Sequence, residues 1–134
     1  MHEWALAEGI IATAEEYGKK NNASEILKIV IVLGELQDIE REILEFAMNQ
    51  LRKGTMLENA AFIFEEERAK FRCRKCCYEW TMSESEDVFS DEIREDIHFV
   101  PEVVHSFLSC PQCGSRDFEV SAGRGVYIKE MEVR

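Results

Sequence analysis

The chain has 134 residues, of which 46% are hydrophobic, a size and composition that suit one compact domain or a small domain with an added module. Its formal net charge of −11 repels phosphate backbones and therefore argues against nucleic-acid binding. No stretch has the roughly 18 apolar residues of a membrane span, and the first residues lack the basic and apolar pattern of a signal peptide, so we expect a cytoplasmic protein without a membrane partner.

Two helices and three strands are predicted outside a cysteine-rich segment. Residues 3–20 carry apolar side chains at helical spacing, and residues 37–55 repeat the pattern with Asp38 as the expected N-cap. The uninterrupted aliphatic run at 29–33 predicts a central strand covered on both faces. The other two strands are expected at 60–73 and, returning to the same sheet, at 123–133.

These elements predict an α+β fold with two helices packed on a small three-stranded mixed sheet and an inserted zinc-ribbon-like module. The first domain is expected to span residues 1–70 and to be completed by a strand within 122–134. The second domain is expected at residues 71–121, where the cysteines lie.

Two C-x₂-C pairs, Cys73/Cys76 and Cys110/Cys113, predict a metal site with four thiolate ligands. Zinc is favoured because tetrahedral sulfur sites select zinc or iron and zinc needs no redox support. An iron electron carrier is an alternative, although it leaves the first domain without a role. Cys77 is either a spare thiol or a competitor of Cys76 for the metal, and the pair spacing favours Cys76.

The N-terminal residues offer a second kind of metal site. The α-amine of Met1 and the backbone nitrogen and imidazole of His2 can chelate one ion in fused rings. A deprotonated amide nitrogen favours square-planar Ni(II) or Cu(II) over zinc. One planar position would remain for a further donor, for which His98 and His105 are the other histidines of the chain.

Four stretches together resemble the HypA family of hydrogenase nickel metallochaperones. They are "MHEWALAEGII" at the start, "GEL" after the central strand, the pair "CRKC" and "CPQCGS", and "GRGVYIKEMEV" near the end. The chain departs from the commonest family pattern at Cys77, which replaces a glycine, and in its longer segment between the two cysteine pairs.

The resemblance implies a nickel-binding α/β domain and a structural zinc domain. The nickel site carries over to His2 with Glu3 beside it, and the zinc ligands to Cys73, Cys76, Cys110 and Cys113, while His98 is our own hypothesis for the remaining nickel donor. The implied function is delivery of Ni(II) to the precursor of the [NiFe] hydrogenase large subunit, with help from HypB, a nickel-handling GTPase or ATPase.

The competing interpretation is a zinc-ribbon module for protein interaction, without nickel delivery. An enzyme is not expected, because the sequence shows no Ser/His/Asp or Cys/His arrangement and no phosphate-binding glycine-rich loop. The sequence also predicts no zinc site with an open position.

Overall fold

The structure is a computed structural model that describes residues 2–84, 96 and 104–134. The described residues form two compact units. Unit 1 comprises the described residues of Met1–Val32, Ile39–Glu65 and Tyr127–Arg134. Unit 2 comprises the described residues of Leu33–Asp38 and Glu66–Val126. The chain therefore passes from one unit to the other at four points.

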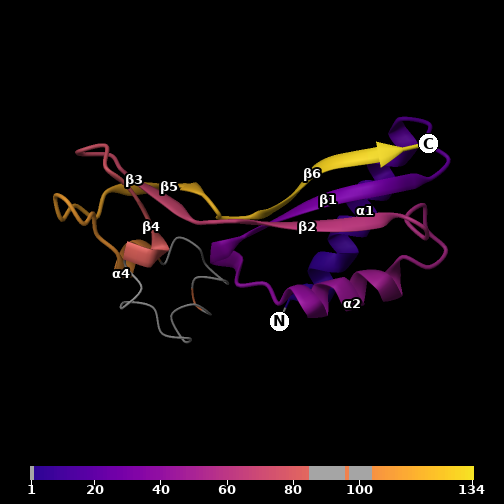
Figure 1. Cartoon of the computed structure of the whole chain (residues 1–134), viewed down its shortest axis with the longest axis horizontal. Helices are drawn as coiled ribbons and strands as arrows, with labels where there is room; N and C mark the ends of the chain where they lie inside the picture. The colour runs from indigo at the N-terminus through magenta and orange to yellow at the C-terminus, as the bar shows by residue number, and fades with distance from the viewer. Residues whose placement is uncertain (1, 85–95, 97–103) are drawn as a thin grey trace. The chain divides into compact units, whose positions relative to one another are not determined.

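Unit 1 contains the two longer helices and a three-stranded sheet in the order β2-β1-β6 (Figure 1). The elements are α1 (Glu3–Lys20), β1 (Ile26–Gly34), α2 (Arg41–Leu51), β2 (Ala61–Glu67) and β6 (Val126–Val133). Each helix buries one apolar stripe at i, i+3, i+4 spacing, as an amphipathic helix does. The stripes are Ala7, Ile10, Ile11 and Ala14 on α1, and Leu44, Ala47 and Met48 on α2.

The sheet of unit 1 is mixed. Antiparallel pairing of β1 with β6 is shown by backbone hydrogen bonds at opposite ends, where Gly34 N–H donates to Gly125 O and Arg134 N–H donates to Glu25 O. β2 runs beside β1 in the same direction after the crossover through α2 (Figure 1). The predicted fold class, with β1 as the buried central strand, is therefore confirmed.

Unit 2 is built on a second three-stranded sheet, in the order β4-β3-β5. Its strands are β3 (Lys70–Cys73), β4 (Glu79–Thr81) and β5 (Phe118–Ala122), and both pairings are antiparallel. The short helix α4 (Val104–Phe107) adds Val104 to the hydrophobic core of unit 2. Phe71, Trp80 and Phe118, which come from the three strands, form the centre of that core with ring centroids 5.2–5.6 Å apart.

Two predicted element boundaries are wrong. The second helix does not begin at Asp38, which has a left-handed φ of 49° after the short 3₁₀ helix η1 (Glu35–Gln37), and α2 begins at Arg41. The strand expected at 60–73 is divided into β2 and β3, which belong to different sheets. The break falls at Arg68 and Ala69, where the Ala69 N–H donates to the Glu35 carboxylate instead of to a strand neighbour.

Two glycines, Gly34 at the end of β1 and Gly123 after β5, stand where no side chain fits. A Cβ on Gly34 would lie 2.4 Å from Gly125 O, and a Cβ on Gly123 would lie 2.5 Å from the Cα of Ala69. Gly123 also has a φ of +80°, which disfavours other residues. These close approaches explain the glycine of the "GEL" motif and the first glycine of the "GRG" motif.

The described helices include none that is both long and apolar enough to cross a bilayer.

Candidate metal centres

The four cysteines of the two C-x₂-C pairs come together in unit 2. Their sulfur atoms all lie within 4.8 Å of one another, and they are the only such group of possible metal ligands among the described residues. The Sγ–Sγ distance is 3.5 Å between Cys73 and Cys113 and 3.6 Å between Cys76 and Cys110. Both distances are far too long for a disulfide bond.

This spacing fits a tetrahedral metal. With zinc–sulfur bonds of about 2.3 Å, the sulfurs of a tetrahedral site are roughly 3.8 Å apart. The resolved sulfur pairs are within a few tenths of an ångström of that value. All four donors are thiol sulfurs, which suit zinc or iron. The nickel site expected from the sequence would use nitrogen donors instead.

The two cysteine turns share one backbone geometry. In the first turn Cys77 N–H donates to Cys73 O at 3.0 Å, and in the second Gly114 N–H donates to Cys110 O at 2.9 Å. Cys77 and Gly114 are both left-handed, with φ of 65° and 77°. Cys77 therefore occupies the position that glycine takes in the second turn, and its exposed thiol is not part of the four-sulfur group.

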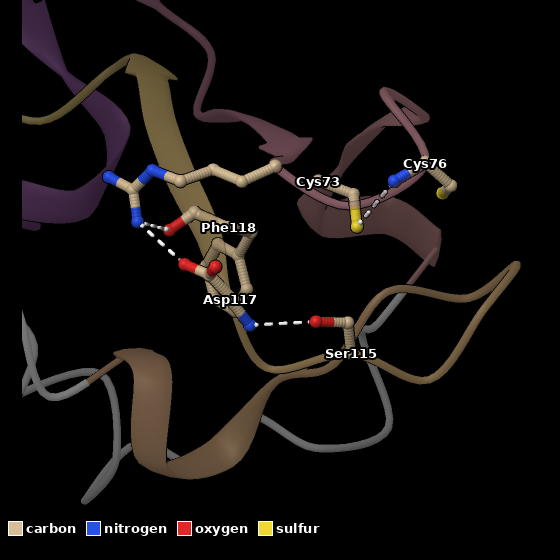
Figure 2. A network of polar contacts seen from close by, with 6 residues as sticks. Cys73, Cys76, Ser115, Asp117 and Phe118 are labelled. Carbon is tan, nitrogen blue, oxygen red and sulfur yellow. Dashed lines mark hydrogen bonds and ion pairs between the residues drawn. The ribbon is translucent and has the colours of Figure 1, made fainter.

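A polar network joins the first turn to the strand that follows the second (Figure 2). Arg74 donates from its backbone N–H to Asp117 O at 2.9 Å, and its guanidinium donates to Asp117 Oδ1 at 3.0 Å and to Phe118 O at 3.3 Å. Asp117 N–H donates to Ser115 Oγ at 3.1 Å. We call the Arg74 and Asp117 contacts the inter-turn clamp.

Crowding of the thiols perturbs their ionisation. The backbone N–H of Cys76 points at the Cys73 sulfur, 3.4 Å away, and lowers the pKa of Cys73 to about 6. The backbone of Tyr78 acts in the same direction on Cys76, but burial and the neighbouring thiols outweigh it and raise the pKa of Cys76 to about 12. Four adjacent thiolates repel one another, so a cation between them would favour ionisation of all four.

The predicted nickel residues that the structure describes lie at the start of α1 in unit 1. His2 is exposed and its carbonyl accepts the N–H of Leu6, whereas Glu3 is only 1% exposed. The Glu3 carboxylate accepts a hydrogen bond from Glu40 N–H at 3.0 Å. Burial opposes ionisation of Glu3, but hydrogen bonds such as this one outweigh it and hold its pKa below the usual value.

The remaining histidines divide into one that is described and one that is not. The ring of His105 on α4 stacks on Phe118 with centroids 4.2 Å apart, so it has a packing role in unit 2. The predicted donors Met1 and His98 lie outside the described residues.

Sequence reasoning did not single out Glu40. Its contact with Glu3 joins a side chain to a backbone N–H 37 residues away, a relation that helical periodicity does not reveal.

Comparison with known proteins supports one family over the whole chain. Residues 1–133 match the family model described as "Hydrogenase/urease nickel incorporation, metallochaperone, hypA". The chain is 59% identical to the hydrogenase maturation factor HypA of Pyrococcus horikoshii over 133 residues, covering 99% of this chain and 96% of that protein. It is 29% identical to HypA of Aquifex aeolicus over the same length, covering 99% and 97%.

A solved structure shares the fold. The solution structure of the Ni metallochaperone HypA from Helicobacter pylori superposes with a TM-score of 0.64 at 20% identity, covering 99% of this chain and 97% of that one. The match of residues 1–133 to the family model and the 59% identity to the Pyrococcus horikoshii protein show that the chain belongs to the HypA family of metallochaperones for hydrogenase maturation.

Proposed function

We propose that the protein binds Ni(II) through its N-terminal residues and delivers it to the precursor of the [NiFe] hydrogenase large subunit. The observation that carries this proposal is the placement of His2, which is exposed at the start of α1 beside the anchored Glu3. An exposed ligand can take up an ion and pass it on without unfolding a core. In this role the protein is a carrier and not an enzyme.

The two sites separate two metals by donor chemistry. Nitrogen donors at Met1 and His2, with Glu3 beside them, suit Ni(II), while Cys73, Cys76, Cys110 and Cys113 would hold Zn(II). Four protein ligands leave zinc no open position, so it would stabilise unit 2 and not react. His98 remains our proposed further nickel donor.

The proposed partners are HypB and the hydrogenase precursor, in the cytoplasm. The relatives carry the name hydrogenase maturation factor, which supports a place in that machinery. The acidic chain, at −11, is compatible with basic protein partners and unfavourable for nucleic acid.

The test is metal binding by zinc-loaded wild type and His2→Ala. Because Trp4 lies two residues from His2 in the sequence, bound nickel should quench Trp4 emission. We expect His2→Ala to lose nickel binding and quenching while keeping one zinc ion. Trp4→Phe should bind nickel without the emission change.

Retention of tight nickel binding by His2→Ala would contradict the proposal. Zinc binding without nickel binding in the wild type would favour the alternative, a zinc-ribbon interaction module. Two further variants test the other nitrogen donors. Extra residues before Met1 should weaken nickel binding if its amine is a ligand, and His98→Ala should change the square-planar absorption if His98 is one.

A further inference from the structure

Three large apolar side chains lie exposed on α1 and α2: Trp4 in the first turn of α1, and Ile43 and Phe46 on α2. The rings of Trp4 and Phe46 meet edge to face, with centroids 6.1 Å apart. Trp4 is 46% exposed, Phe46 58% and Ile43 40%. Ile43 and Phe46 are three residues apart on α2 and therefore neighbours on its surface. We call these three residues the aromatic patch.

The core of unit 1 does not need this patch. The buried face of α2 is already formed by Leu44, Ala47 and Met48, all with 0% exposure. Single exposed apolar residues are ordinary, but a contiguous group with two aromatic rings is typical of an interaction surface. Tryptophan in particular is enriched among the residues that dominate binding energy.

The surroundings of the patch are acidic. Glu8 follows Trp4 by one helical turn, and Glu42 and Glu45 flank Ile43 and Phe46, all three glutamates being exposed. The first eighteen residues contain no lysine or arginine, and Arg41 is the only basic residue of α2. The guanidinium of Arg41 lies 5.3 Å over the ring of Phe64.

The acidic side chains around the aromatic patch indicate which kind of partner can bind to it. A second copy of the chain docked through the same surface would bring the two acidic rims together, which is repulsive. A partner with lysines or arginines around an apolar side chain would complement both the rim and the rings. We therefore infer that the aromatic patch is a docking surface for a cationic protein segment with at least one large apolar side chain.

The patch lies near the proposed nickel residues within unit 1. Trp4 is in the same first turn of α1 as Glu3, and Glu3 is bonded to Glu40 just before α2. A segment docked here would lie close to His2. Its role in nickel transfer rests on the proposed function, whereas the docking itself does not.

The probe is a helical peptide of about 18 residues with leucine on one face and lysine on the other. Binding to the zinc-loaded full chain is measured by calorimetry and by the emission of Trp4. Phe46→Ser removes a patch residue, and Tyr17→Ser removes a matched aromatic of α1 that is 55% exposed and outside the patch. A peptide of lysine and serine tests for purely electrostatic attraction.

We expect Phe46→Ser to weaken binding of the leucine–lysine peptide about tenfold or more, and Tyr17→Ser to change it less than twofold. Trp4→Ser should act like Phe46→Ser, which guards against a folding defect of one variant. Replacing Glu42 and Glu45 by lysine should also weaken binding, most strongly at low salt.

Equal effects of Phe46→Ser and Tyr17→Ser, equal binding of the lysine–serine peptide, or no binding at about 1 mM peptide would each overturn the inference. Nickel affinity is measured on the same variants. An unchanged nickel affinity in Phe46→Ser with lost peptide binding supports a separate docking surface. Absence of nickel binding in the wild type would instead refute the proposed function and leave the docking result standing.

Discussion

Replacing Cys77 by glycine should stabilise unit 2. Cys77 has a φ of 65°, in the region that disfavours residues with a Cβ by roughly 1–2 kcal/mol. Glycine removes this penalty but gains freedom in the unfolded chain, which offsets about 0.5–1 kcal/mol. The difference leaves a net stabilisation of about 0.5–1 kcal/mol for Cys77→Gly.

The measurement is equilibrium unfolding of the zinc-loaded protein in guanidinium chloride. Trp80, which is 2% exposed in the core of unit 2, reports unfolding when Trp4 is replaced by phenylalanine in every variant. For a slope of about 2–3 kcal/mol/M, the midpoint of Cys77→Gly should rise by roughly 0.2–0.4 M.

Two variants separate backbone strain from thiol chemistry. Cys77→Ala removes the thiol but keeps the left-handed residue, so its midpoint should stay near that of the wild type. Gly114→Ala introduces the strain into the second turn, where φ is +77° and nothing lies within 4 Å of the added Cβ. It should lose about as much stability as Cys77→Gly gains.

A fall in the midpoint of Cys77→Gly, or an equal gain in Cys77→Ala, would refute this reasoning. Loss of zinc from both Cys77 variants would show that Cys77 and not Cys76 holds the metal. Zinc content measured alongside the unfolding curves decides between these outcomes.

Three further predictions concern the clamp, the close-packed glycine and the buried carboxylate. Arg74→Ala should speed zinc transfer to a coloured chelator about twofold to fivefold, and Lys129→Ala, which breaks an exposed pair in unit 1, should leave the rate unchanged. Gly34→Ala should lower the free energy of unfolding by about 1–3 kcal/mol, because the added Cβ overpacks the site. Gly125→Ala has open space around its Cβ and should change the free energy of unfolding by less than about 0.5 kcal/mol in the same denaturation assay. The pKa of Glu3 lies below its usual value of 4.5, so its charged form stabilises the fold above about pH 4.5, and this stabilisation is lost as the pH falls. Glu3→Gln should therefore make the free energy of unfolding depend less on pH in the acid range, as measured by circular dichroism.

Local patterns in the sequence predicted unit 1 well. The buried stripe of α1, a helix of 18 residues, repeats at helical spacing, and β1 is aliphatic because it is the central strand. Both signals arise from burial within one element, which is what hydrophobic periodicity records. The start of α2 was missed because Asp38, a common N-cap residue, is used in the left-handed end of η1.

The second sheet was not predicted because its strands are short and joined over long separations. β4 has three residues and β5 lies about 40 residues further along, so neither offers a period to count. The cysteine spacing still predicted which four thiols gather, since each pair is held by a local turn. The Glu3–Glu40 and Arg74–Asp117 contacts depend on tertiary structure and leave no local signal.

The four chain crossings between units constrain the order in which the protein can fold during synthesis. β6 completes the sheet of unit 1, yet its residues leave the ribosome after nearly all of unit 2 has been made. Until β6 has been made, one edge of β1 has no strand partner. Both cysteine turns precede β6 in the sequence, so they are made first and can already bind a metal. The nascent chain can thus gather its four thiols before the helix that carries His2 rests on a finished sheet.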